Sequence, residues 1–362
     1  MAGNFVQLHN HTHYSLLDGA SKVPDLVKRV KELGMPAVGI TDHGNMHGAY
    51  ELWRAAVDSG VKPIIGIEAY VTPETARQDK TRVSWDTNWT PVPGHARNPD
   101  DVSGGGLITH LTMWAENDEG LVNLIKASSV ANLEGRVMRY PRMDKEVLST
   151  YSKGVIASSG CPSGIIQTRL RLGQFDEALR AAGEFQDIFG KDNFYIELMD
   201  HGLSIESKVA GDLLTIAKKL GAPLLATNDS HYVMEADKDA QDAMLCINSG
   251  ATLDDPNRFK FEGSGYYIKS AEEMRELFKD HPDACDNTLE IAERCNVIFD
   301  DHEDGAFMPQ FDCPEGWDET SLFLKKVEEG LEKRYDGNPP MEVLKQADYE
   351  CGVICQMQFC GY

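Results

Sequence analysis

The chain has 362 residues, enough for one barrel of about 250 residues with an appendage, or for two domains. Its 41% hydrophobic and 26% charged residues are an ordinary globular composition. It shows no signal peptide, and no apolar stretch reaches the roughly 18–20 residues of a membrane span. We therefore expect a cytoplasmic protein with no membrane partner.

The formal charge of −23 restricts the partners of the chain. Nucleic-acid binding draws on lysine and arginine, and an acidic surface repels nucleic acid at long range. If nucleic acid is the substrate, metal ions or another polypeptide must supply the attraction, and a partner with a basic surface is equally compatible. Eight cysteines are too few for a disulfide scaffold, so we expect reduced thiols.

The first 250 residues alternate strand-like and helix-like segments. Buried strands are predicted by apolar runs at residues 5–8, 37–40, 63–71, 107–113, 154–158, 194–198 and 223–226. Helices are predicted by amphipathic stretches at residues 23–33, 50–59, 121–133, 175–189 and 205–220. Seven βα units in a row favour a parallel barrel over a sandwich.

Two stretches depart from this alternation. Residues 72–106 are rich in Pro, Asn, Asp and Gly, and they predict a long inserted loop over one end of the barrel, of a length that often serves as a functional lid. After Gly250 the pattern predicts a hairpin at residues 259–269. Helices are then expected at residues 271–279, 284–295, 319–334 and 341–358.

Nine side chains can bind metal, and most of them fall at or near the C-terminal ends of the predicted strands. His9 and His11 lie two apart on the first strand, so both point to one face. The carboxyl ends of barrel strands converge on one face, which is where such folds place their active sites. The nine residues are His9, His11, Asp18, His43, Glu68, His110, Cys161, Asp229 and His231.

This ligand set indicates several ions and a phosphate ester. Imidazole, carboxylate and thiolate suit zinc, manganese or iron, and nine ligands are too many for one four- to six-coordinate ion. Three divalent ions carry six positive charges against four negative ones from Asp18, Glu68, Asp229 and a Cys161 thiolate. A bridging hydroxide would leave about one positive charge. Such a site binds a phosphate ester and lowers the pKa of water toward roughly 7, so no side-chain nucleophile is needed.

Other polar residues have weaker patterns. His201, after the sixth strand, is the best additional candidate for a substrate contact. Arg169 is a second candidate, although ordinary helix-surface pairing explains it about as well. His13 and His47 lie off the pattern and suit supporting roles, and His95 falls in the predicted lid. The spacing of Cys351, Cys355 and Cys360 invites a metal site, but no fourth ligand is adjacent and core packing is favoured.

With these residues in view, the chain resembles the polymerase and histidinol phosphatase (PHP) family. It is most similar to the PHP domains at the N-terminus of bacterial replicative DNA polymerase III alpha subunits of the actinobacterial type. The motifs that carry the likeness are residues 8–12, 39–46, 66–70, 160–164, 197–202 and 226–232. Residues 257–261 and 265–270 are also polymerase-like.

The resemblance implies a distorted (βα)7 barrel with a small, mainly helical C-terminal extension. Residues 1–250 would form the barrel, and residues 251–362 would resemble the start of the polymerase region. The implied centre holds three divalent ions. His9, His11, Glu68 and Asp229 would hold one, Glu68 with His110 and Cys161 the second, and Asp18, His43 and His231 the third. The predicted catalytic residues are Asp229, Glu68 and His11.

The activity that the resemblance implies is a 3′–5′ exonuclease that proofreads the 3′ end of DNA. A sliding clamp, a clamp loader or other replisome proteins are the implied partners. The sequence ends near the expected start of a polymerase palm and contains no paired-aspartate palm motif, so we expect no polymerase activity from it. It fits both a fragment of a polymerase and a free-standing, for example viral, PHP protein.

Two alternatives stay open at this point. One is a phosphatase acting on a small phosphomonoester, against which the polymerase-like residues 251–362 argue. The other is a non-catalytic module that binds replisome components or mimics the host's own PHP region, which the acidic charge favours.

Overall fold

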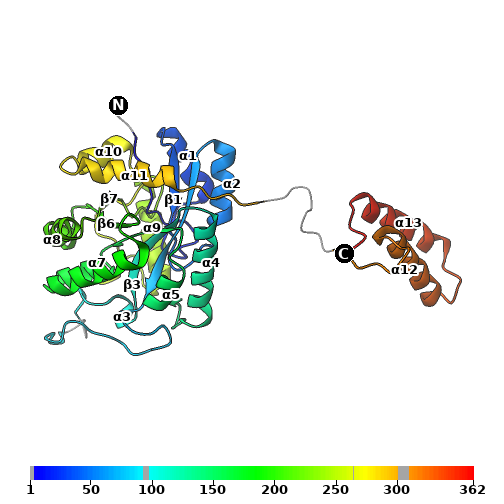
Figure 1. The fold of residues 1–362 in the computed structure, drawn as a ribbon, viewed down its shortest axis with the longest axis horizontal. Helices are drawn as coiled ribbons and strands as arrows, with labels where there is room; N and C mark the ends of the chain where they lie inside the picture. The colour runs from blue at the N-terminus through cyan, green and yellow to red at the C-terminus, as the bar shows by residue number, and fades with distance from the viewer. Residues whose placement is uncertain (1–3, 93–97, 264, 301–309) are drawn as a thin grey trace. The chain divides into compact units, whose positions relative to one another are not determined.

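The structure, a computed structural model, describes residues 4–92, 98–263, 265–300 and 310–362. The chain divides into two compact units, Met1–Phe299 and Asp300–Tyr362. In the first unit the helices lie around the outside of a curled sheet (Figure 1). In the described part of the chain, no helix combines the length and apolar character that crossing a bilayer requires.

The sheet of the first unit has the strand order β1-β2-β3-β5-β6-β7, with β4 paired to β2. Its core strands are nearly continuous buried runs, as expected where both faces of a sheet are covered. The strands are β1 (Ala37–Ile40), β2 (Lys62–Val71), β3 (Thr109–Ala115), β4 (Arg142–Met143), β5 (Val155–Ser158), β6 (Phe194–Leu198) and β7 (Leu224–Ala226).

Residues 7–11 close the sheet into a barrel. Gln7 forms a parallel bridge with Val38 of β1, and Asn10 forms one with Ser230 just after β7. The predicted strand at residues 5–8 is not a regular ladder, because side chains take up the backbone groups. The Asn10 amide donates to the carbonyls of Gln7 and Gly39, and the Val6 N–H donates to the Thr288 hydroxyl. The α/β barrel class is nevertheless confirmed.

One strand corrects the expectation of a purely parallel barrel. β3 runs antiparallel to both β2 and β5. A parallel return needs a crossover that brings the chain back to the other end of the sheet. Residues 72–108 contain no such crossover in their described part, only the short helix α3 (Ser103–Gly106). The chain therefore re-enters the sheet at the end where β2 stops.

The predicted helices match the observed ones to within three residues at each end. Gly60 and Gly221 adopt the left-handed conformation that ends α2 and α8. The helices are α1 (Val23–Glu32), α2 (Ala49–Ser59), α4 (Asp118–Leu133), α5 (Lys145–Thr150), α6 (Ile165–Arg171), α7 (Phe175–Phe189), α8 (Ser204–Leu220), α9 (Lys238–Ser249), α10 (Ala271–Leu277), α11 (Pro282–Arg294), α12 (Glu319–Arg334) and α13 (Met341–Gln356).

The barrel interior is apolar at one end and polar at the other. Alternation along β2 puts Ile64 and Glu68 on one face, and along β3 it does the same for Trp114 and His110. The apolar end is a buried cluster with members from every long strand and from α11. It comprises Val6, Leu8, Ala37, Ile64, Trp114, Ile156, Tyr195, Leu225, Ile291, Ala292 and Cys295. The metal-competent residues occupy the other end.

This packing corrects two expectations for the residues after Gly250. The first unit extends to Phe299, because α11 closes the apolar end of the barrel. The predicted hairpin at residues 259–269 is wrong, since the described residues of this stretch form no strand. Instead, Tyr267 forms a parallel bridge with Tyr232 after β7.

The second unit contains α12 and α13. Neither helix has a buried residue. The Sγ atoms of Cys355 and Cys360 lie 3.4 Å apart, and both thiols are half-buried, so the expected core packing of these cysteines is not observed within this unit.

Candidate metal centre

The nine predicted ligands meet at the polar end of the barrel. His9 and His11 lie on the closing segment, Glu68 near the end of β2, and Cys161 just after β5. His110 is the second residue of β3, and because that strand is antiparallel, its beginning lies beside the end of β2. The reversed strand therefore brings His110 to the same end as the other ligands.

His9, His11 and Asp229 form the first donor group. Their ligand atoms lie within 4.8 Å of one another. Oδ1 of Asp229 is 3.3 Å from Nε2 of His9 and 3.1 Å from Nε2 of His11. All three side chains come from the adjacent segments that close the barrel, so the same backbone pairing that closes the barrel brings these donors together.

Glu68 links the first group to a second one. Its Oε1 lies 3.0 Å from Nδ1 of His110, and its Oε2 lies 2.6 Å from Nδ1 of His43 and 3.4 Å from Nε2 of His11. The Sγ of Cys161 lies 3.3 Å from Nδ1 of His110. The two carboxylate oxygens thus face different histidines, which is the arrangement a bridging ligand requires.

A third group surrounds Asp18. Nε2 of His43 lies 2.9 Å from Oδ2 of Asp18, and Nε2 of His231 lies 3.8 Å from the same oxygen. Ligand atoms of His11, His43 and His231 also lie within 4.8 Å of one another. His43 therefore faces Glu68 with one ring nitrogen and Asp18 with the other.

Some buried nitrogen and oxygen atoms make no hydrogen bond, and they test whether these residues fit metal ions. Leaving a buried polar atom unpaired is costly, so such atoms are rare in folded proteins. Seven of them belong to the predicted ligands and are gathered in this one place. They are His9 Nε2, His11 Nε2, Asp18 Oδ1, His43 Nδ1, Glu68 Oε2, Asp229 Oδ1 and His231 Nε2. This donor set fits divalent cations.

The charges of the centre point the same way. Burial opposes ionisation of Glu68 and Asp229, but the surrounding histidines outweigh it and hold both pKa values well below the usual range. Burial likewise opposes protonation of His9, but the carboxylates of Asp229 and Glu197 raise its pKa well above the ordinary histidine value. Burial and the Glu68 carboxylate raise the pKa of the Cys161 thiol. In the metal-free protein, protonated histidines therefore balance the negative charge of the buried carboxylates.

Sequence reasoning missed the residues that orient the ligands. Glu197, fully buried on β6, has Oε1 2.7 Å from Nδ1 of His9, and this contact directs Nε2 toward the centre. Ser15 contacts Nδ1 of His11 at 2.9 Å and donates to Asp42 at 2.7 Å. Such outer partners fix the tautomer and orientation of metal-ligating histidines. Asp42 stood beside His43 in a predicted motif, which was the available signal.

The two predicted substrate contacts are not supported by the geometry. His201 has Nδ1 2.7 Å from Glu206 and Nε2 2.9 Å from the Asn228 carbonyl, so neither ring nitrogen is left for a substrate. Arg169 pairs with Glu74 and its guanidinium stacks 3.7 Å from the centroid of the Trp85 ring. Both residues therefore organise neighbouring segments.

The remaining histidines named from the sequence lie outside the centre. His13 is partly exposed, with Nε2 4.0 Å from Glu51, and His47 is exposed. His95 lies outside the described residues. None of these observations places a further histidine among the ligands.

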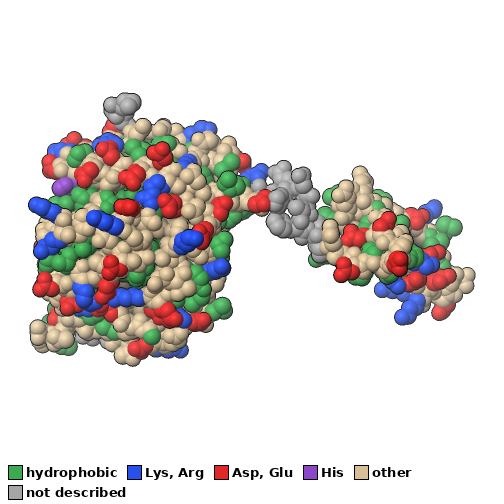
Figure 2. Space-filling model, in the orientation of Figure 1, with side chains coloured by type: hydrophobic (Ala, Val, Ile, Leu, Met, Phe, Trp, Pro, Cys, Tyr) green, Lys and Arg blue, Asp and Glu red, His purple; other side chains and the backbone are tan. Residues whose placement is uncertain are grey.

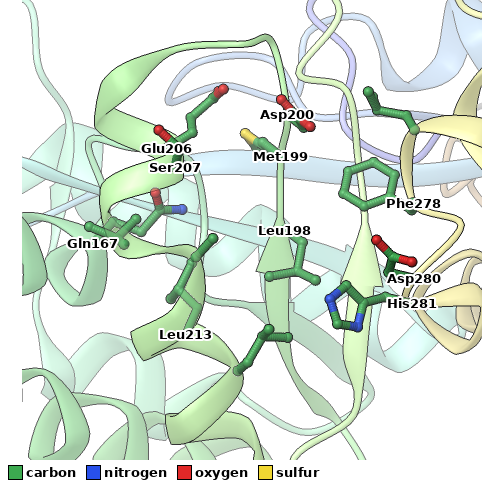
Figure 3. A pocket seen from close by; sticks show the side chains of 14 residues that line it. Gln167, Leu198, Met199, Asp200, Glu206, Ser207, Leu213, Phe278, Asp280 and His281 are labelled. Atoms are coloured by element: carbon green, nitrogen blue, oxygen red, sulfur yellow. The ribbon is translucent and has the colours of Figure 1, made fainter.

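A separate cavity of about 300 Å³ lies beside α8 (Figure 3). Leu198, Leu213 and Phe278 form its apolar wall, while Asp200 and His281 stand at its edges. Among the described residues, none of the three donor groups includes a side chain of this cavity. It is therefore separate from the metal centre.

Comparison with known proteins places seven of the nine candidate ligands inside a known family region, which ends before Asp229 and His231. A family model described as "PHP domain" matches residues 7–201. DNA polymerase III subunit alpha of Mycobacterium leprae is 50% identical over 99% of this chain, and that of Borreliella burgdorferi is 39% identical over the same share. The chain spans about 30% of the length of these relatives.

Solved structures resemble the chain only distantly. A Bifidobacterium adolescentis protein assigned as a metal-dependent phosphoesterase is 16% identical, with a TM-score of 0.36, over 64% of this chain and 88% of its own. The residues of this chain, rather than that likeness, therefore carry the functional argument.

Proposed function

Because this chain belongs to the PHP domain family, we propose that its first unit is a metal-dependent phosphoesterase that removes nucleotides from the 3′ end of DNA. The observation that carries this proposal is the set of seven buried ligand atoms at one end of the barrel that face one another without making a hydrogen bond. Donors of this kind at the carboxyl end of barrel strands suit hydrolysis with a metal-activated water.

We assign the ligands to three divalent ions. His9, His11 and Asp229 would hold one, with Glu68 bridging to a second held by His110 and Cys161. Asp18, His43 and His231 would hold the third. Zinc, manganese and iron all suit this mixture of imidazole, carboxylate and thiolate. Bound ions would supply Lewis acidity to the phosphate oxygens and to the attacking water.

The protein's own groups shape the reaction in two ways. Glu68 directs Oε1 toward His110 and Oε2 toward His43 and His11, so it would set the spacing between neighbouring cations once they bind. Glu197 and Ser15 hold His9 and His11 with their Nε2 atoms toward the centre. Within the described residues no serine, threonine or free cysteine is held as a side-chain nucleophile by a histidine base outside this cluster. The water route remains the one that the donor set supports.

DNA is the substrate that the relatives favour. Their likeness covers 99% of this chain, including residues 251–299 of the first unit, which lie outside the matched PHP region. A proofreading exonuclease in the setting of a replisome, with a sliding clamp or clamp loader nearby, is consistent with that similarity. Polymerase activity is not part of the proposal.

The test compares Asp229→Asn with wild type on a 5′-labelled primer with a mismatched 3′ end. Asparagine tolerates the left-handed backbone of Asp229 (φ +43°), so the variant removes charge while keeping the fold. We expect the manganese- or zinc-loaded wild type to shorten the primer and the variant to lose at least about 100-fold in rate, a ~2.7 kcal/mol change in the barrier. Asp212→Asn, at an exposed position on α8, is the matched control and should keep full activity.

Several outcomes would contradict the proposal. Equal digestion by wild type and Asp229→Asn would remove the catalytic assignment. Turnover of a small phosphomonoester without digestion of DNA would favour a phosphatase. No hydrolysis by metal-loaded protein, together with tight binding to a replisome protein, would favour a non-catalytic module.

A further inference from the structure

Two phenylalanines stand at the rim of the metal centre. The ring of Phe261 meets the ring of His231 edge to face, with centroids 4.6 Å apart. Phe259 meets Phe261 in the same way at 6.0 Å and is 61% exposed. The ring of Tyr266 packs against that of Phe261, with centroids 4.7 Å apart. An aromatic surface therefore leads from a predicted metal ligand out to solvent.

A cavity of about 420 Å³ adjoins this surface. Phe261 lines it, and so does Gln241, whose side chain donates to the backbone carbonyl of Asp18. One wall is thus tied to the segment that carries a predicted ligand. The volume lies within the usual range for ligand sites.

Two of the three basic side chains that line this cavity remain available to a ligand. Arg258 is paired with Asp242 at 2.6 Å, which holds the phenylalanine-bearing loop against α9. In the part of the chain that the structure describes, the ammonium groups of Lys238 and Lys260 have no ion-pair partner. Three acids also line the cavity, Asp239, Asp242 and Glu262, so its formal charges balance.

We propose that Phe259 and Phe261 form a stacking shelf that holds unpaired 3′-terminal bases of DNA beside the metal centre, with Lys238 and Lys260 facing the backbone phosphates. This inference rests on the proposed function and names the form of the substrate. Every base has a π-face, so aromatic side chains bind single strands without regard to sequence. A balanced local charge cannot hold a polyanion by itself on so acidic a protein, and stacking supplies what charge does not.

The shelf implies selection for frayed ends. A terminal base that remains paired and stacked in a duplex has no free face to offer, whereas a mismatched base leaves the stack at lower cost. A strand end with unpaired bases should therefore reach the metals more readily than a fully paired end.

The first experiment reads binding without hydrolysis. A single strand with 2-aminopurine at its 3′ terminus is added to the full chain carrying Asp229→Asn, and fluorescence quenching reports stacking. Adding Phe259→Ala should weaken binding about five-fold to a hundred-fold and abolish the quenching, whereas Phe259→Trp should retain both. Phe311→Ala, which removes a phenylalanine of similar exposure from the second unit, is the matched control and should change neither.

The second experiment compares digestion of frayed and fully paired 3′ ends. Metal-loaded wild type should prefer the frayed end, and Phe259→Ala should lose that preference. Unchanged quenching and an unchanged rate ratio in Phe259→Ala would overturn the shelf while leaving the exonuclease proposal intact. If wild type digests no DNA, the proposed function fails, and the quenching still decides whether the shelf binds a strand end.

Discussion

Asp229, a candidate metal ligand, has an unusual backbone conformation. Its φ of +43° lies in the left-handed region, which few residues other than glycine, asparagine and aspartate adopt. The turn places Oδ1 within 3.3 Å of two histidine nitrogens. Strained positions of this kind concentrate at functional sites. The two-residue spacing of Asp229 and His231 made Asp229 a candidate ligand but could not indicate this conformation.

The orientation of His9 gives a prediction about Glu197. The carboxylate accepts hydrogen bonds from the Thr227 and Ser158 hydroxyls and contacts Nδ1 of His9, all in a fully buried setting. Glu197→Gln replaces an acceptor with a group that also donates, so it disturbs the tautomer that leaves Nε2 free for metal. We expect metal affinity to fall roughly 10- to 100-fold, measured by competition with a chelator.

A control separates positioning from general damage to the fold. Glu293→Gln changes an exposed carboxylate in the same unit and should leave metal affinity unaltered. If Glu197→Gln binds metal as tightly as wild type, the contact with His9 has no part in holding the ligand.

The candidate ligands could be picked out from the sequence, whereas the residues that orient them could not. His9, His11, Asp18, His43, Glu68, His110, Cys161, Asp229 and His231 stood out because their chemistry recurs at strand ends, and the structure brings them together. Glu197 looked like an ordinary strand residue, since its partners lie on other strands. Arg169 and His201 looked available because a sequence shows a side chain without its partners.

At the level of elements, long strands and amphipathic helices followed from periodicity, and three things did not. The direction of β3 depends on how the long insertion returns, which local pattern does not encode. The helices α5, α6 and α9 were not predicted, the first two because they are short. Residues 259–269 have strand-like composition but pair with Tyr232 rather than with themselves.

The inserted loop gives a prediction at this scale. Arg169 of α6 anchors it through Glu74 and through the Trp85 ring, and Gln174 donates to the Trp85 carbonyl at 2.9 Å. Arg169→Lys keeps the positive charge but loses the planar guanidinium, which stacks on Trp85 and can donate two hydrogen bonds side by side. We expect a loss of about 1–2 kcal/mol in stability and faster hydrogen exchange in residues 72–92.

Hydrogen-exchange mass spectrometry with a matched variant decides this point. Arg136→Lys alters an exposed arginine and should leave the exchange of the loop unchanged. Equal protection of residues 72–92 in wild type and Arg169→Lys would show that other contacts hold the loop.

For the whole molecule, the net charge of −23 is the property that follows most directly from the sequence. Acidic and basic side chains are interspersed over the face seen in Figure 2, so the excess of acids is not one continuous field there. Three of the acids, Asp18, Glu68 and Asp229, lie at the polar end of the barrel, where positive charge balances their carboxylates. The net charge of the whole chain therefore says less about DNA binding than the balance of charges at the polar end of the barrel.

That balance predicts how metal should stabilise the protein at different pH. Neighbouring carboxylates overcome the effect of burial and raise the pKa values of His9 and His11, and Tyr70 together with Glu68 and Asp18 does the same for His43. Protonation of these histidines therefore stabilises the metal-free fold at low pH, and this stabilisation is lost as pH rises through the folded values. The three carboxylates, with lowered pKa values, stay ionised across pH 6–8 and add no change there. Metal requires neutral imidazole, so its affinity should rise over this window.

We therefore expect manganese or zinc to raise the Tm of the first unit more at pH 8 than at pH 6, since stabilisation grows with ligand concentration relative to Kd. Calorimetry of chelator-treated and metal-loaded protein measures the gain. His231, whose pKa burial lowers to about 4, is already neutral and adds nothing to the slope. Asp229→Asn should shrink the gain at both pH values. A gain that is equal at pH 6 and pH 8 would mean that metal does not replace protons at these histidines, and the charge argument for the centre would fail.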